Sequence, residues 1–258
     1  MDNKGKAAVV TGGAGGIGRC IAENFLEAGN SVAIIDTDEA SGAKMTERYG
    51  NKLLFFPGDV GEEKTLSAFV EAVLSRFPSI HYLINNAMRS KGGILSGCGY
   101  KDFEYTLRVG VTAPYFLAMK FKDRFGKDAA IVNISSSRSS QSQPDTESYT
   151  AAKGGIAALT HALSASLAGI VRVNAIAPGW IDISPWHEGV ALQQHSLPDQ
   201  WQHPARRIGK AEDIAKLALF LCSKDAGFIN GQEIFADGGM SKLMIYHDDC
   251  GWLYRPDS

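Results

Sequence analysis

The sequence predicts an α/β fold: one domain with a doubly wound, seven-stranded parallel sheet and helices on both of its faces. Short apolar segments alternate along the chain with segments whose apolar residues recur at helical spacing, which is typical of such sheets. The first apolar segment ends at a glycine-rich turn. The 258 residues contain no internal repeat, low-complexity tract or convincing linker, so a single domain accounts for them.

Bulk composition excludes several classes of partner. Hydrophobic residues make up 45% of the chain, which is ample for a large core. A net charge of -2 and a pI near 6.3 leave no basic footprint, so neither nucleic acid nor an anionic membrane is an expected partner. The stretch before the first apolar segment, residues 1–6, is short and polar. No segment approaches the ~18 consecutive apolar residues of a membrane span. The cysteines lie far apart and are expected to be reduced in a cytoplasmic protein: Cys20, Cys98, Cys222 and Cys250.

The first unit of the chain is a strand, a glycine turn and a helix. Residues 7–10 are apolar, T-G-G-A-G-G-I-G follows at residues 11–18, and a helical pattern comes next. This order opens a Rossmann-type βαβ unit, which binds dinucleotides. Gly12, Gly16 and Gly18 carry the spacing that lets the backbone approach a diphosphate at the helix N-terminus. A purely structural turn is the alternative.

The second strand ends at an acidic residue that bears on the choice of cofactor. Residues 31–35 are mostly apolar, and Asp36 follows eighteen residues after Gly18. An acid ~20 residues beyond the turn accepts hydrogen bonds from the adenosine ribose, and its carboxylate would repel a 2′-phosphate. NAD is therefore favoured over NADP. Asp36 could also open the next helix as its N-cap, together with Asp38 and Glu39, and both roles could hold at once.

Strands and helices continue to alternate along the rest of the chain. Further strands are expected at residues 53–56, 82–84, 131–134, 171–177 and 232–235, and helices at 62–77, 100–124, 149–168 and 211–222. The fourth strand ends in Asn85-Asn86-Ala87. This asparagine pair either holds neighbouring loops or contacts a ligand.

The segment 131–155 carries the candidate chemistry. It begins as an apolar strand, continues as a serine-rich loop and ends on Tyr149 and Lys153. Positions i and i+4 share a helix face, so the ammonium can lie near the phenol. Forming a phenolate at neutral pH costs roughly 4 kcal/mol, and a nearby cation offsets part of this cost. The pair can act as an acid/base, although an isolated Y-x-x-x-K is also found on ordinary solvated helices.

Residues 180–207 interrupt the alternation. They include three tryptophans, three prolines and three histidines, without a clear strand or long helix. A long irregular segment in a compact domain is usually functional, and we predict a substrate lid beyond the carboxyl ends of the strands. His187, His195 and His203 lack an acidic or cysteine partner set, so no metal site is expected.

Taken together, these motifs resemble the short-chain dehydrogenase/reductase family over about residues 4–241. The matching pieces occur in the family's order. They are the turn at residues 11–18, Asp59-Val60, Asn85-Asn86-Ala87, the strand I-V-N-I-S-S, Tyr149 with Lys153, Pro178-Gly179 and Asp237-Gly238-Gly239. Residues 1–241 then form the catalytic domain, and 242–258 a tail.

The resemblance implies an NAD-dependent oxidoreductase that interconverts a secondary alcohol and its ketone. The family's serine, thirteen residues before its tyrosine, corresponds to Ser136, which would hold the substrate oxygen. Tyr149 would exchange the proton, and Lys153 would lower the tyrosine's pKa and bind the nicotinamide ribose. The implied NAD-binding residues are Gly12, Gly15, Gly16, Ile17, Gly18, Asp36, Asp59, Val60, Asn86, Ala87, Tyr149, Lys153, Pro178, Gly179 and Ile181. The family also implies strand order 3-2-1-4-5-6-7 and a homodimer or homotetramer.

Two positions depart from the family's pattern. Gly110 occupies the place of an asparagine that kinks the long fourth helix and anchors a water of the proton relay. Glycine could keep the kink but lacks the amide. Met88 stands where the family usually has glycine, which would narrow the pocket. An NAD-binding sensor or weakly active pseudoenzyme is therefore the alternative function.

Two further features bear on substrate and partners. Arg138, two residues after Ser136, could meet a carboxylate or phosphate of the substrate, or could bond loop carbonyls or Asp145. We slightly favour the structural role. Trp252 and Tyr254 in the aromatic tail would be costly if exposed, and are predicted to pack on a partner subunit or over the pocket.

Overall fold

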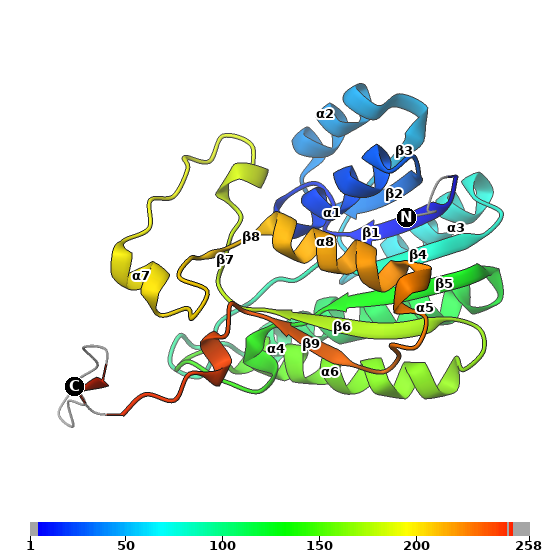
Figure 1. Cartoon of the computed structure of the whole chain (residues 1–258). Helices are drawn as coiled ribbons and strands as arrows, with labels where there is room; N and C mark the ends of the chain where they lie inside the picture. The colour runs from blue at the N-terminus through cyan, green and yellow to red at the C-terminus, as the bar shows by residue number, and fades with distance from the viewer. Residues whose placement is uncertain (1–4, 247, 250–258) are drawn as a thin grey trace.

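The computed structural model, which describes residues 5–246 and 248–249, has a single seven-stranded parallel sheet at its centre (Figure 1). The strand order is β3-β2-β1-β4-β5-β6-β9, and every neighbouring pair is parallel. In chain order this is 3-2-1-4-5-6-7, so the predicted fold class and strand order are confirmed. The order reverses between β1 and β4, and ligands bind beside such a switch point.

The elements follow the expected alternation closely. The sheet strands are β1 (Ala7–Thr11), β2 (Ser31–Asp36), β3 (Leu53–Pro57), β4 (Ile80–Asn85), β5 (Phe125–Ile134), β6 (Arg172–Pro178) and β9 (Glu233–Ala236). The main helices are α1 (Gly16–Glu27), α2 (Glu39–Tyr49), α3 (Glu63–Arg76), α4 (Tyr100–Leu107), α5 (Ala113–Phe121), α6 (Glu147–Ser166) and α8 (Ala211–Cys222).

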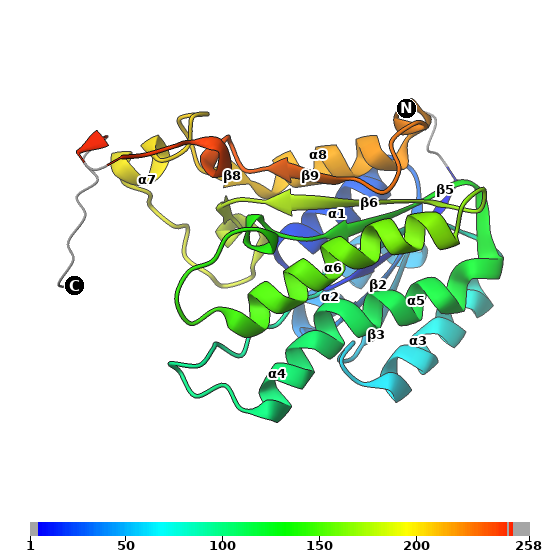
Figure 2. The same cartoon turned by 90° about the horizontal axis from the view of Figure 1, so that it is seen from below.

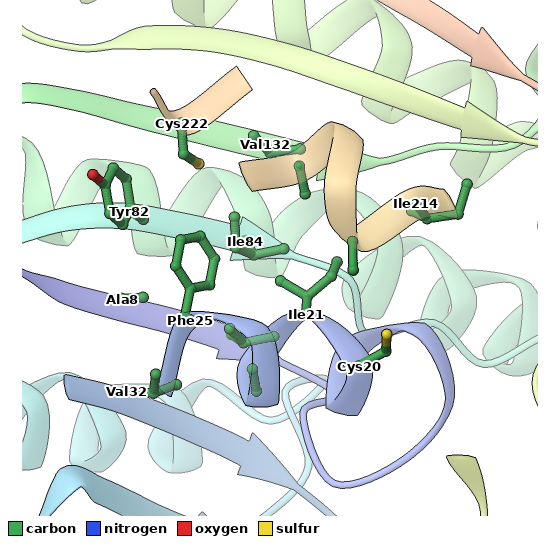
Figure 3. Packing of buried hydrophobic residues seen from close by; sticks show 14 of the residues in the cluster. Ala8, Cys20, Ile21, Phe25, Val32, Tyr82, Ile84, Val132, Ile214 and Cys222 are labelled. Atoms are coloured by element: carbon green, nitrogen blue, oxygen red, sulfur yellow. The ribbon is translucent and has the colours of Figure 1, made fainter. Parts of the chain in front are cut away.

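Two hydrophobic layers hold the helices to the sheet. Successive side chains of a strand point to opposite faces, so Val10 packs with α1 and α8 while Val9 packs with α3 and α5. Figure 2 shows α3, α5 and α6 along the second face. On the first face, Phe25 of α1 stacks on Tyr82 of β4 with ring centroids 5.1 Å apart, and Ile214 of α8 belongs to the same hydrophobic cluster (Figure 3). Both faces of the sheet are therefore covered, as a parallel sheet requires.

The long helix expected at residues 100–124 is interrupted. A π-helical turn, Arg108–Thr112, separates α4 from α5 and has Gly110 at its centre. Such turns insert one extra residue into an α-helix and are frequent at functional sites. The helix thus departs from regular geometry at the position where the family's asparagine is replaced by glycine.

The segment predicted as a lid contains only short elements. These are β7 (Ile181–Asp182), a 3-10 turn (Ser184–Trp186) and α7 (Leu197–Trp201); β7 pairs with β8 (Gly209–Lys210) just beyond the segment. Figure 1 shows the segment projecting beyond the carboxyl ends of the sheet strands. This small two-stranded sheet was not predicted, because two residues give too short a pattern.

The end of the described chain runs away from the body of the protein (Figure 1). Leu243, Met244, Ile245 and Tyr246 are exposed in the single subunit. Trp252, Tyr254 and Cys250 lie outside the described residues, so the packing of the tail remains a prediction. Among the described helices, none is long and apolar enough to cross a membrane.

Candidate active site

A cavity of about 460 Å³ lies at the carboxyl ends of the sheet strands. Its walls come from the segments that follow β1 to β6 and from the lid, so it sits at the switch point of the sheet. The predicted site residues that line it are Gly12, Gly15, Gly16, Ile17, Asp36, Asp59, Val60, Asn86, Ala87, Ser136, Tyr149, Lys153, Pro178, Gly179 and Ile181. The fold therefore brings together residues that are up to 169 positions apart, since Gly12 and Ile181 share one cavity.

The glycine turn is tied to the end of β4. The side-chain amide of Asn86 donates to the carbonyl oxygens of Thr11 and Gly12 over 3.1 and 3.0 Å. Asn86 thus holds a neighbouring loop while also lining the cavity. Gly18 is absent from the cavity wall: a Cβ there would lie 2.0 Å from the oxygen of Gly12. Its role is close packing of α1 against the turn, which is the role that the third glycine has in dinucleotide-binding turns.

Asp36 organises the same turn. Its carboxylate accepts the backbone N–H of Ala14 over 2.9 Å and that of Asp38 over 3.0 Å. The N-cap of α2 is Asp38, whose side chain accepts the N–H of Ser41. Asp36 therefore does not cap α2 itself, and it remains at the cavity wall, where a ribose could reach it.

Tyr105 is a site residue that the sequence reasoning missed. Its hydroxyl donates to Asp59 over 2.7 Å, and both residues line the cavity. Burial, reinforced by the bond to Asp59, raises the pKa of Tyr105 to about 12. The phenol therefore stays protonated and orients the Asp59 carboxylate. Nothing in the local pattern marks Tyr105, because its role depends on a contact between α4 and the loop after β3.

The catalytic candidates meet where β5 ends and α6 begins. Ser136 has extended backbone and 8% exposure, and its Oγ accepts the N–H of Arg138 over 3.2 Å. Lys153 is 5% exposed, and its Nζ donates to the oxygen of Ile134 over 2.7 Å and lies 5.4 Å from the ring centroid of Tyr149. Burial lowers the pKa of Lys153 to about 8.

The surroundings of Tyr149 act on the pKa of its phenol in two directions. Burial raises the pKa of its phenol; the hydrogen bond with Ser136 and the positive charge of Arg138 act in the opposite direction. Two cations lie near the ring: the Nζ of Lys153 is 5.4 Å and the guanidinium carbon of Arg138 is 5.6 Å from its centroid. The lowering effect that the resemblance assigns to Lys153 stays a prediction, and Arg138 is a further cation whose effect on this pKa the sequence reasoning did not foresee.

Arg138 has a partner in the serine-rich loop. Its guanidinium donates to the side-chain oxygen of Gln143. Asp145, named as a possible partner, instead accepts the backbone N–H groups of Leu95 and Ser96, each over 2.9 Å. No carboxylate among residues 5–246 and 248–249 forms an ion pair with Arg138. The guanidinium is thus held over Tyr149 with its charge uncompensated by an acid.

The closing motif supports the other end of the cavity. A Cβ on Gly179 would lie 2.7 Å from the Cβ of Asp237, so the two segments are in close contact. Asp237 in turn accepts the backbone N–H groups of Gly239 and Ser241, each over 2.9 Å. The sequence motif Asp237-Gly238-Gly239 therefore acts as a brace behind Pro178 and Gly179.

The three lid histidines have separate surroundings. His187 lines the cavity against Gly15, His195 lies 3.1 Å from Asp182, and His203 is buried with Nδ1 3.1 Å from the carbonyl oxygen of Asp199. The sequence suggests for His187 only the role of a metal ligand, which is not expected here. Its place on the glycine turn follows from long-range contacts of the lid.

Gly110 and Met88 are in contact with each other. A Cβ on Gly110 would lie 3.1 Å from the sulfur of Met88 and 2.9 Å from the Cβ of Ala152, the residue before Lys153. The two departures from the family's pattern are therefore linked: the methionine takes up space next to the glycine. Met88 also lines the cavity, and the narrowing of the pocket stays a prediction.

The cavity fits a nicotinamide dinucleotide. Gly12 and Gly16 have φ values of 63° and 55°, which favour glycine. The turn itself carries no bulky side chain at the N-terminus of α1, and the imidazole of His187 lies against it. Asp36 stands at the end of β2 to meet a ribose, and Lys153 stands at the opposite wall. The glycine turn, Asp36 and Lys153 therefore match what a nicotinamide dinucleotide requires of its binding site.

Comparisons with known proteins are consistent across sequence and structure. A family model described as enoyl-(acyl carrier protein) reductase matches residues 12–241. An uncharacterized oxidoreductase of Thermotoga maritima is 38% identical over 254 residues, which cover 95% of this chain and 99% of the relative. An apo SCOR enzyme from Clostridium thermocellum shares 44% identity with a TM-score of 0.89, and the match covers 99% of each chain. The 3-ketoacyl-(acyl-carrier-protein) reductase of Brucella melitensis, complexed with NADH, is 29% identical with a TM-score of 0.82 and covers 93% of this chain and 100% of its own.

Proposed function

Because the chain belongs to the short-chain dehydrogenase/reductase family, we propose that it is an NAD-dependent oxidoreductase that interconverts a secondary alcohol and its ketone. One observation carries this proposal. Ser136, Tyr149 and Lys153 meet at a single cavity whose other wall is the glycine turn. A proton-transfer group and a dinucleotide site therefore face the same space.

The proposed chemistry assigns one task to each residue. The bound nicotinamide supplies or accepts the hydride. Ser136 donates a hydrogen bond to the substrate oxygen and positions it beside Tyr149. The phenol of Tyr149 gives its proton to that oxygen in reduction and takes it back in oxidation. Lys153, held by the carbonyl of Ile134, binds the ribose next to the phenol.

A survey of substrates tests the proposal. Purified protein is supplied with NAD or NADH and a panel of secondary alcohols and ketones, and the nicotinamide absorbance band is followed. We expect coupled turnover of at least one pair. Tight binding of NAD in calorimetry without turnover of any pair would instead favour the alternative function, an NAD-binding sensor. The relatives described above are named as an oxidoreductase and a reductase, which favours the enzyme.

The choice of NAD over NADP rests on Asp36. Asp36→Asn keeps an acceptor for the N–H of Ala14 but removes the negative charge. We expect the preference for NADH over NADPH to fall by about tenfold, which corresponds to about 1.4 kcal/mol. Fluorescence titration with NADH and with NADPH gives the two dissociation constants, whose ratio is the preference. Asp38→Asn serves as the comparison, since asparagine also caps helices. An unchanged preference in Asp36→Asn would contradict the assignment.

Arg138 is expected to set the pH dependence of alcohol oxidation. The phenolate of Tyr149 is the active base, so the rate rises with pH through the pKa of this residue. Because the charge of Arg138 lowers that pKa, Arg138→Gln should move the rising limb of kcat/KM to higher pH. The pH profile of any accepted alcohol measures the shift. Arg124→Gln, at an exposed residue, is the control, and a shift to lower pH in Arg138→Gln would refute the role.

The remaining expectations stay predictions. A homodimer or homotetramer, a cytoplasmic location and a role of the tail in assembly follow from the sequence and the resemblance. Sedimentation of the full chain, compared with a chain that ends at Lys242, tests the oligomer and the tail together.

A further inference from the structure

The lid places His187 directly on the glycine turn. The Cε1 and Nδ1 atoms of His187 lie 2.6 and 2.8 Å from a Cβ built on Gly15, and Nε2 lies 3.2 Å from a Cβ built on Gly16. The two glycines therefore leave the room that the imidazole occupies. Within the described part of the chain, neither ring nitrogen of His187 forms a hydrogen bond, whereas one ring nitrogen of His195 and one of His203 each have a partner.

The chemistry of this place suits an imidazole. The turn and the N-terminus of α1 are where the diphosphate of a dinucleotide binds, because free N–H groups and the helix dipole favour negative charge there. An imidazole N–H at the same spot, where the Asp38 carboxylate also lies near His187, can donate to a phosphate oxygen. Hydrogen bonds to charged acceptors are the strong ones.

Contacts on both sides of His187 hold it in position. Before it, the indole N–H of Trp186 donates to Glu212 of α8 over 3.2 Å. After it, the carboxylate of Glu188 bridges Arg19 of α1 at 3.0 Å and Lys44 of α2 at 2.8 Å. The lid is thus fastened to three helices, α1, α2 and α8.

We propose that His187 is a binding residue for the cofactor diphosphate and that Glu188 is the positioning residue that holds it there through Arg19 and Lys44. The inference rests on the proposed function, since it assumes that a nicotinamide dinucleotide occupies the cavity. It adds a contact that comes from the lid rather than from the glycine turn, so the lid itself would help to hold the cofactor.

Binding measurements with ligands that differ in their phosphates test the role of His187. NADH is titrated by fluorescence, and ADP-ribose and adenosine by calorimetry. We expect His187→Ala to weaken NADH and ADP-ribose by about tenfold and to leave adenosine, which lacks phosphate, unchanged. His187→Asn, which keeps an N–H donor, should recover part of the loss, and His161→Ala is the control. Equal affinities of His187→Ala and wild type, or an equal loss for adenosine, would overturn the assignment.

A double-mutant cycle tests the role of Glu188. Glu188→Gln removes the charge that binds Arg19 and Lys44, and should weaken NADH about threefold in the wild-type background. In the His187→Ala background the same change should have no effect, because Glu188 acts through His187. Asp128→Asn, which removes a remote surface ion pair with Lys224, is the control. Independent, additive effects would overturn the positioning role.

The outcomes separate this inference from the proposed function. A wild-type protein that binds neither NADH nor ADP-ribose overturns both. A wild-type protein that binds both ligands, with variants that bind them equally well, leaves the proposed function standing and overturns only the role of His187.

Discussion

Tyr149→Phe is expected to lower kcat for every accepted substrate by roughly 10²–10⁴-fold, the usual contribution of a general acid or base. The change removes one oxygen and keeps the ring. The contacts of that ring with Arg138 and Lys153, at 5.6 and 5.4 Å from its centroid, are therefore retained. The lost group is the one that hydrogen-bonds Ser136 and exchanges the proton with the substrate oxygen.

The matched control is Tyr105→Phe in the same cavity. This hydroxyl contacts Asp59 at 2.7 Å rather than the catalytic serine, so its loss should weaken NADH binding modestly while leaving kcat nearly unchanged. Steady-state kinetics and NADH titration of both variants make the comparison. Retention of more than a tenth of the wild-type kcat in Tyr149→Phe would place the proton chemistry elsewhere.

The glycine turn and the pair Tyr149 and Lys153 could be recognised in the sequence because their spacing is local; most of the remaining site residues followed from the family resemblance. Tyr149 and Lys153 are one helical turn apart, and a helix fixes their relation wherever it lies in the fold. The glycine turn likewise joins a strand and a helix that are adjacent in sequence. The order of motifs then placed these local pieces in one family, whose strand order the structure repeats.

The rest of the site depends on contacts that span the chain. His187 lies against the glycine turn, and its neighbour Glu188 pairs with Arg19, 169 residues away. Tyr105 and Asp59 meet across 46 positions. No periodicity encodes such contacts. The π-helical turn at Gly110 is also invisible to periodicity, because one inserted residue leaves the apolar spacing on either side helical.

The electrostatics of the site likewise has one part that sequence spacing predicts and another that only the folded structure determines. The sequence placed a cation near Tyr149 through the i, i+4 relation with Lys153. Burial at the end of β5, which cannot be read from spacing, directs the ammonium of Lys153 to the carbonyl of Ile134. Arg138, on the loop that returns over the ring, adds a second positive charge that lowers the pKa of the phenol.

Gly110→Asn is expected to lower the free energy of unfolding by about 1–3 kcal/mol, the usual cost of overpacking, and to leave turnover no higher than in wild type. The new Cβ would lie 2.9 Å from that of Ala152 and 3.1 Å from the sulfur of Met88, and the amide would extend further into the same space. A relay asparagine therefore cannot be restored by this substitution alone. Gly99→Asn is the control, because a Cβ at that exposed position meets no atom within 4 Å and asparagine suits the N-cap of α4.

Met88→Gly should make room for the asparagine. If the methionine fills the space that the family's amide would need, Gly110→Asn combined with Met88→Gly should be more stable than the sum of the single changes predicts, by about 0.5–3 kcal/mol. Urea denaturation of the four proteins measures this coupling, and kinetics show whether the double variant gains turnover. A coupling energy of zero would mean that the two substitutions affect stability independently. The side chain of Met88 would then not be what fills the space that an asparagine amide at position 110 needs.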